Sequence, residues 1–183
     1  RFTYDPMNRL TESYDAYNAF ASSTYDERGD VVATKDPAGR TTIFVYDGFR
    51  RLSEIHDPAG NITKNYYDKA GNKTRVVSPD TTENTFVYDN GNRMTVFRDA
   101  LNHAVTSTYD AAGNKRSEID RRGMTTRYDY DALNRLTETR NPADTVTTFT
   151  YDANGNRLSE TIASGTARTA TVFAYDTLNR IVT

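Results

Sequence analysis

The sequence contains no cysteine and no tryptophan, and only five of its 183 residues are proline. The absence of cysteine excludes a disulfide framework, a thiolate nucleophile and a cysteine-based zinc site. Long hydrophobic runs are also missing, because segments such as residues 43–46 fall far short of the roughly 20 residues that cross a bilayer. Neither sign of charge dominates, since 23 Lys and Arg stand against 25 Asp and Glu. We therefore expect a soluble chain with no nucleic-acid partner and no membrane insertion.

The residues that are abundant favour strands and turns. The chain has 28 threonines and 13 tyrosines, both of which are common in strands, and 10 glycines that suit turns. No window keeps apolar residues at the i, i+3, i+4, i+7 spacing of an amphipathic helix for three turns. The composition therefore predicts an all-β protein.

A repeat of 21 residues organises the whole chain. The dipeptide Tyr-Asp occurs nine times, with eight copies spaced by 21 residues and the ninth following after 24. The nine copies are Tyr4-Asp5, Tyr25-Asp26, Tyr46-Asp47, Tyr67-Asp68, Tyr88-Asp89, Tyr109-Asp110, Tyr130-Asp131, Tyr151-Asp152 and Tyr175-Asp176. The longer last interval contains small residues at 163–167, which predict a lengthened surface loop.

A second turn signal lies eleven residues after each Tyr, and we call these positions the half-unit turns. They begin at Asp15, Asp36, Asp57, Ser78, Asp99, Asp120 and Asn141. Two of them read Asp-Pro-Ala-Gly, with Asp36, Pro37 and Gly39 in one and Asp57, Pro58 and Gly60 in the other. Asp at the first position, Pro at the second and Gly at the fourth are typical of a type I turn.

The Tyr-Asp turns carry a matching signal three residues after the Asp. These positions are Asn8, Gly29, Arg50, Gly71, Asn92, Gly113, Asn134, Gly155 and Asn179. Gly and Asn tolerate a positive φ at the least cost, so we predict a left-handed residue here, with Arg50 as a strained or rearranged exception. Each unit is then strand, turn, strand, turn, which gives about 17 antiparallel strands along the chain.

Alternate units differ, so the full period is 42 residues. After the turn, some units read Asn-Arg and others Gly-Asn, and the residue two before the Tyr is aromatic in the first kind and small or polar in the second until Phe149 breaks the rule. The aromatic face needs aliphatic residues between its tyrosines, which lie about 9.6 Å apart at ordinary strand spacing. We expect these to be Leu52, Ile55, Val76, Met94, Val96, Ile119, Leu136, Leu158 and Ile162. A ribbon of so many strands is expected to curl as a spiral or shell wall.

These units resemble the YD repeats of the RHS family, as in residues 151–158, which read Tyr-Asp-Ala-Asn-Gly-Asn-Arg-Leu. The family includes bacterial Rhs-type polymorphic toxins and the C component of insecticidal toxin complexes, with the teneurin repeats more distant. The resemblance implies a β-shell that encloses a C-terminal toxic domain. The family's Asp-Pro-x-Gly-Leu self-cleavage motif is absent, because Arg40 follows Gly39 and Asn61 follows Gly60. We therefore expect neither self-cleavage nor toxicity from these residues.

No residue stands out as catalytic or metal-binding. The carboxylates recur in every unit, whereas acid and base catalysis needs a distinct pair, so we interpret them as turn caps and expect at most adventitious calcium. His56 and His103 occupy different phases of the repeat, which suits surface or packing roles. The phased tyrosines are interpreted as packing residues, with carbohydrate stacking as the alternative, for which Tyr14, Tyr17 and Tyr66 lie outside the register.

The sequence thus predicts a non-enzymatic fragment of a longer protein, without cofactor or catalytic site. We expect residues 1–183 to be one YD-repeat β-sheet of about nine units with no separate second domain. The expected partners are the remaining repeats and a C-terminal toxin passenger of a secreted or cell-surface bacterial protein. The alternative is a carbohydrate-binding or cell-adhesion surface built from the same repeats.

Overall fold

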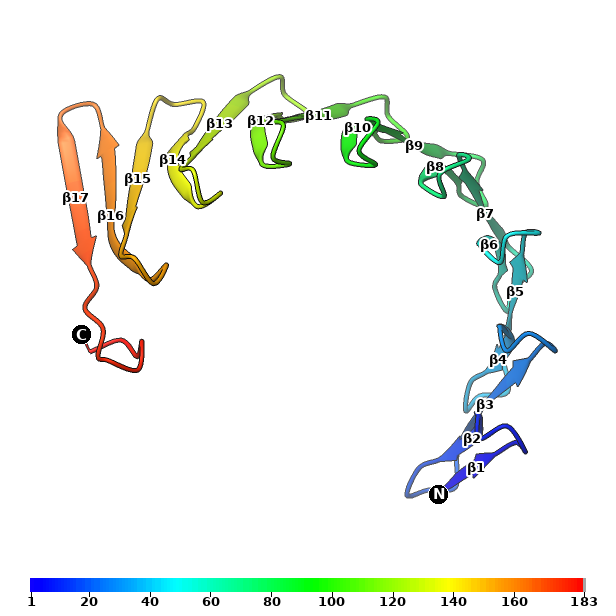
Figure 1. Ribbon diagram of the computed structural model, residues 1–183. Coiled ribbons are helices and arrows are strands. Elements are labelled where there is room, and N and C mark those ends of the chain that lie inside the picture. The colour runs from blue at the N-terminus through cyan, green and yellow to red at the C-terminus, as the bar shows by residue number, and fades with distance from the viewer. Residues whose placement is uncertain (183) are drawn as a thin grey trace. The chain divides into compact units, whose positions relative to one another are not determined.

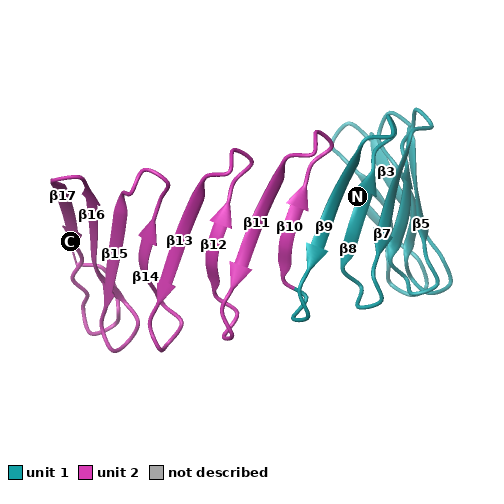
Figure 2. Ribbon diagram, turned by 90° about the horizontal axis from the view of Figure 1, so that it is seen from above, with its two compact units in different colours: residues 1–92 teal, residues 93–183 magenta. Residues whose placement is uncertain are grey.

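The computed structural model describes residues 1–182, and all regular structure in them is β. No helix in this part of the chain is long and apolar enough to cross a membrane. The chain divides into two compact units, residues 1–92 and the residues from 93 onward (Figure 2). The predicted all-β class with repeated antiparallel hairpins is confirmed.

Strands follow one another in chain order and have five or six residues in most cases (Figure 1). The first unit contains β1 (Phe2–Tyr4), β2 (Leu10–Tyr14), β3 (Phe20–Tyr25), β4 (Val31–Lys35), β5 (Thr41–Tyr46), β6 (Leu52–His56), β7 (Ile62–Tyr67), β8 (Lys73–Val77) and β9 (Glu83–Tyr88). The second contains β10 (Met94–Arg98), β11 (Ala104–Tyr109), β12 (Lys115–Ile119), β13 (Thr125–Tyr130), β14 (Leu136–Arg140), β15 (Val146–Tyr151), β16 (Arg157–Ser164) and β17 (Ala167–Val172).

Within each unit, every strand pairs antiparallel with the next one along the chain. The Tyr-Asp turns join the strands at one rim of the ribbon and the half-unit turns at the other, because consecutive hairpins reverse the chain at opposite strand ends. The pairing slips by one residue at the phased tyrosine: Val45 faces Glu54, but Tyr46 faces Leu52. This bulge accommodates the left-handed residue of the turn.

All nine residues at the predicted left-handed position have positive φ, from 59° at Asn92 and Asn179 to 97° at Gly113. Arg50 is among them, with a φ of 62°. The half-unit turns repeat this conformation at their fourth residue, where Thr81 adopts a φ of 69°. A β-branched residue rarely adopts such a conformation. The two sets of turns therefore share one backbone design.

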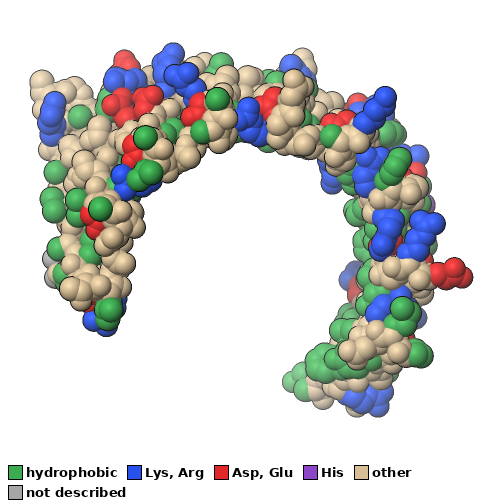
Figure 3. All heavy atoms as spheres, viewed as in Figure 1, with side chains coloured by type: hydrophobic (Ala, Val, Ile, Leu, Met, Phe, Trp, Pro, Cys, Tyr) green, Lys and Arg blue, Asp and Glu red, His purple; other side chains and the backbone are tan. Residues whose placement is uncertain are grey.

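The ribbon has no hydrophobic core among the described residues, in which only Asn65 and Ser107 are buried, each 7% exposed. Charged side chains of both signs are interspersed with apolar ones on the surface that Figure 3 presents. Cross-strand partners share a face, and Ile55 faces Phe44 on the tyrosine side as predicted. Val96 and Ile119 instead face Thr106, which lies on the side opposite Tyr109, so their predicted packing between the tyrosines is wrong.

The prediction of a lengthened loop at residues 163–167 is also wrong. The pairing of β16 and β17 runs to Ser164 opposite Ala167, so only Gly165 and Thr166 form the turn. Gly165 has a positive φ of 56° at the first turn position, as a type II′ hairpin turn requires. The three extra residues extend the strands, because residues with alternating small and β-branched side chains continue the ladder at no conformational cost.

Candidate functional site at the Tyr-Asp turns

The aspartate of each Tyr-Asp turn organises the turn through both of its carboxylate oxygens. In the turn after β5, Asp47 Oδ1 accepts hydrogen bonds from the backbone N–H groups of Phe49 at 2.9 Å and Arg51 at 3.0 Å. Asp47 Oδ2 accepts a hydrogen bond from Arg51 Nε at 2.7 Å. The aspartate thus satisfies turn donors that would otherwise face solvent and fixes the side chain four residues later.

That side chain lowers the pKa of the aspartate. The Arg51 guanidinium is the leading cause of a lowered pKa at Asp47, whose ordinary value is 3.8. At Asp68 the leading cause is a hydrogen bond from the Asn72 side chain. Partial burial opposes these shifts but does not overcome them, so the turn carboxylates stay ionised at neutral pH.

The residue four after the Asp divides the turns into two classes. We call the turns with arginine at this position Arg turns; the residues are Arg9, Arg51, Arg93, Arg135 and Arg180. We call the others Asn turns; their residues are Asn72, Asn114 and Asn156, with Asp30 in the same place. The two classes alternate along the rim, which is the structural form of the 42-residue period.

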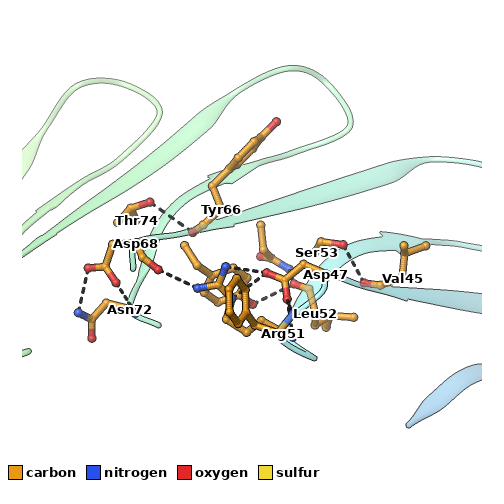
Figure 4. A network of polar contacts seen from close by, with 12 residues as sticks. Val45, Asp47, Arg51, Leu52, Ser53, Tyr66, Asp68, Asn72 and Thr74 are labelled. Carbon is orange, nitrogen blue, oxygen red and sulfur yellow. Dashed lines mark hydrogen bonds and ion pairs between the residues drawn. The ribbon is translucent and has the colours of Figure 1, made fainter. Parts of the chain in front are cut away.

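In an Arg turn, the guanidinium reaches forward to the following turn (Figure 4). Arg51 Nη1 donates a hydrogen bond of 2.7 Å to the backbone carbonyl of Asp68. The same guanidinium lies over the ring of Tyr67, with its carbon 4.8 Å from the ring centre. One side chain therefore holds the aspartate of its own turn and both residues of the next Tyr-Asp pair.

This arginine bridge recurs with nearly constant geometry. The other instances run from Arg9 to Asp26 at 3.1 Å, from Arg93 to Asp110 at 2.9 Å and from Arg135 to Asp152 at 2.8 Å. Each arginine also stacks on the tyrosine of the turn it reaches. Arg180 keeps the contact with its own Asp176, but its side chain is 73% exposed, against 26% for Arg51. The following turn thus covers about half of the guanidinium arm.

In an Asn turn, an amide makes the forward connection instead. Asn114 Nδ2 donates to Asp110 Oδ2 in its own turn at 3.0 Å and to Asn134 Oδ1 in the next turn at 2.8 Å. The same pair of contacts joins Asn72 to Asn92. Asn156 reaches Asn179 at 2.8 Å even though the longer β16–β17 hairpin intervenes. The asparagine that receives the bond is the left-handed residue, so its positive φ turns the amide towards its neighbour.

The exceptional Arg50 replaces one of these amide bridges by an ion pair. Asp30 stands where the Asn turns have asparagine, and Arg50 stands where the following turn has its left-handed asparagine. The guanidinium donates from Nη2 to Asp30 Oδ1 at 2.6 Å and from Nε to Asp30 Oδ2 at 2.8 Å. The two substitutions compensate each other, and the bidentate pair keeps the rim connected at a position where arginine adopts a costly backbone conformation.

The phased tyrosines connect each hairpin to the preceding one. Six of them donate their hydroxyl to a backbone carbonyl at the start of an earlier strand, as Tyr67 does to Leu52 at 2.9 Å. The other five are Tyr25, Tyr46, Tyr109, Tyr151 and Tyr175. Partial burial raises the pKa of Tyr67 above its ordinary 10.0, which keeps the hydroxyl protonated as a donor. Tyrosine contacts point backward and arginine or asparagine contacts point forward along the same rim.

The half-unit rim has the same local capping without the same repeated bridge. Asp36 Oδ2 accepts a hydrogen bond from Arg40 Nε at 2.7 Å, but Arg40 is 69% exposed and its printed contacts stay within its turn. One ion pair between turns occurs on this rim, from Arg121 to Asp99 at 3.2 Å. The Tyr-Asp rim is therefore the cross-linked side of the ribbon.

The tyrosines and histidines outside the repeat contacts lie in other surroundings. Tyr17 is 91% exposed at a half-unit turn and Tyr66 is 40% exposed on a strand. Tyr14 packs against Phe20, with ring centres 5.7 Å apart. His56 contacts Glu54 at 2.8 Å, and His103 lies 3.4 Å from Asp99. No group of three potential metal ligands occurs among residues 1–182.

Sequence reasoning placed the Tyr-Asp pairs and the left-handed residues but gave no role to the residue four after the Asp. The alternation of Asn-Arg with Gly-Asn was the signal that could have found the bridges. Turns on one rim are two strands apart, about 9.6 Å, which is within the reach of an arginine side chain that leans forward. Arginine and asparagine at a fixed place in alternate turns thus indicate a contact between turns.

The fold and the rim define a class of protein, in which β-hairpins of one repeat form a single-layer ribbon held by turn-to-turn contacts. The family model described as "RHS Repeat" matches residues 25–62, 109–146 and 130–167, which together cover just over half of the chain. The chain belongs to the RHS repeat family.

Solved structures show the same fold. A crystal structure of TcdB2-TccC3 without its hypervariable C-terminal region matches with a TM-score of 0.78 and 17% identity, over 98% of this chain and 12% of that one. The Photorhabdus luminescens Tc holotoxin pore with the TccC3 D651A mutation matches with a TM-score of 0.75 and 19% identity, over 98% and 11%. This chain thus spans about an eighth of the chains it matches. No curated protein matches its sequence.

Proposed function

We propose that these RHS repeats form a segment of a wall that encloses or displays a C-terminal toxin passenger. In this proposal residues 1–183 act as one stretch of the wall within a secreted or cell-surface bacterial protein, and the remaining repeats complete it. The repeats contribute a barrier and no chemical reaction. The likeness in fold to the TcdB2-TccC3 structures supports the shell architecture.

The observation that carries the proposal is a single-layer ribbon that is stabilised without a core. Bridges such as Arg51 to Asp68 and Asn114 to Asn134 connect turns two strands apart, so stability is distributed along the ribbon. Neither face of the sheet is needed to bury a second layer of the described chain. One face is therefore free to bound an interior while the other meets solvent, which is the physical requirement for a wall.

Limited proteolysis of the longest product of the gene tests the proposal. A passenger behind the wall should survive protease concentrations that degrade the same passenger expressed alone. The double variant Arg51→Ala, Arg135→Ala removes two bridges and should expose the passenger several-fold faster. The matched control Arg40→Ala, Arg122→Ala removes two arginines whose printed contacts stay within their own turns, and should leave protection unchanged.

Digestion of the passenger at the rate of the free domain would contradict enclosure. Protection that is equal in the bridge variant and the control would contradict the role of the rim. In either case a glycan-binding screen becomes the next experiment, with the 91% exposed Tyr17 as the first residue to replace.

A further inference from the structure

The two classes of Tyr-Asp turn differ at their tips, which we define as the residue two after the Asp. Four of the five Arg turns carry a large apolar side chain there, and the fifth has Gly91. These side chains are exposed: Met7 by 69%, Phe49 by 82%, Leu133 by 68% and Leu178 by 69%. The Asn turns have no large apolar tip; theirs are Arg28, Ala70, Ala112 and Asn154.

The conformation of the turn does not explain these apolar tips. The tip contributes its backbone N–H to the Asp carboxylate, as Phe49 and Leu133 do at 2.9 Å, and any residue supplies that group. The Arg51 guanidinium lies 5.3 Å from the centre of the Phe49 ring and leaves most of the ring uncovered. Exposed apolar residues at one repeated position, on one rim and in one class of turn, mark a contact surface.

We propose that these tips dock into the half-unit rim of a second YD-repeat ribbon, stacking one tier of ribbon on another. The half-unit rim offers small tips, such as Ala38 and Ala59, and hollows between successive turns. One hollow of about 660 Å³ lies between the two Asp-Pro-Ala-Gly turns and is lined by Gly39, Pro58 and Ala59 among others. An apolar tip that enters it removes its own surface and that of the proline from water.

The spacing of the two rims selects this occupant. Arg turns recur every four strands, about 19 Å, and half-unit turns every two strands, about 9.6 Å. The tips therefore meet every second hollow along the whole length of a matching ribbon, whereas a partner without this spacing engages one tip at a time. Both rims belong to the same kind of repeat, so their spacings agree by construction.

Stacked tiers also follow from the height of the ribbon, and this inference rests on the proposed function. A strand of five or six residues is about 17–20 Å long, whereas a 100-residue domain has a radius of gyration near 13 Å and a correspondingly larger diameter. One tier is too low to enclose such a domain. A wall needs several tiers, and the apolar tips supply their contact.

Cross-linking between copies of this chain tests the contact, because the sequence has no cysteine of its own. Phe49→Cys and Ala59→Cys are made as separate proteins, mixed and treated with a short bismaleimide. The control mixture pairs Phe49→Cys with Ile43→Cys, which places an exposed cysteine on a strand face away from either rim. We expect several-fold more mixed dimer from the rim pair than from the control.

Equal yields from the two mixtures would overturn the docking. A predominance of Phe49→Cys dimers linked to themselves would overturn the assignment of the half-unit rim as the receptor. A variant with serine at all four apolar tips should associate less by sedimentation velocity, while the control Ala70→Ser, Ala112→Ser associates like the parent. The chain carries no passenger in these experiments, so failure here with a passenger still protected from protease contradicts the tier contact alone.

Discussion

Replacing Arg51 by alanine should weaken the ribbon measurably, although the residue lies in a surface turn. The substitution removes a charge-assisted hydrogen bond to the Asp68 carbonyl and the stacking on Tyr67. Hydrogen bonds with a charged partner contribute about 1.5–3 kcal/mol, and an exposed cation–π contact about 0.5–1 kcal/mol. Allowing for competition from water, we expect a loss of about 2 kcal/mol, which lowers the melting temperature by roughly 4–8 °C in a chain of this size.

Arg40→Ala is the matched control for this prediction. Arg40 has the same Nε contact to an aspartate four residues earlier, at the same 2.7 Å, but no printed bridge to another turn. We expect its melting temperature to change by no more than about 1–2 °C, as is usual for surface substitutions. Thermal unfolding followed by circular dichroism at pH 7 compares the two variants. Equal melting temperatures would refute the reasoning that the bridge between turns stabilises the ribbon.

A coupling measurement separates the two contacts of the bridge. Tyr67→Leu removes the ring under the guanidinium but leaves the Asp68 carbonyl in place. Arg51→Ala should therefore cost less in the Tyr67→Leu background than in the parent, by about 0.5–1 kcal/mol. Full additivity would show that the stacking contributes nothing.

Three further changes test the turns and their charges. Thr81→Gly should raise the melting temperature by roughly 2–4 °C, because it relieves a β-branched residue at positive φ; a decrease would contradict the strain. Gly113→Val should lower stability by about 2 kcal/mol more than Ala112→Val, because only the former forces a side chain into a φ of 97°; equal melting would contradict it. Acid should destabilise the ribbon: the lowered pKa of Asp47 and Asp68 means that their contribution is complete above 3.8 and is lost as pH falls through the folded values. A melting temperature that is constant from pH 6 to pH 3 would oppose this.

The strands and turns could be predicted from the sequence because each unit repeats the same local chemistry. A Tyr-Asp pair followed by Gly or Asn three residues after the Asp specifies a tight turn wherever it occurs, and nine phased copies leave little freedom for another fold. Confirmation of the antiparallel hairpins rests on this redundancy. Local signals of this kind require no knowledge of which turns become neighbours.

Contacts between turns could not be predicted in the same way. The link from Arg51 to Asp68 depends on the direction in which a side chain leans, which the sequence does not specify. The strained Arg50 became intelligible only once Asp30 was found beside it. The side on which Val96 and Ile119 lie depends on strand register, and a bulge at each Tyr-Asp turn shifts that register by one residue.

A structure of the longest product of the gene, by electron microscopy, tests the central claim most directly. The account predicts that the RHS repeats bound a volume occupied by density for a passenger, with one face of this stretch turned towards it. An open sheet with no enclosed volume, or a passenger bound wholly outside the repeats, would contradict it.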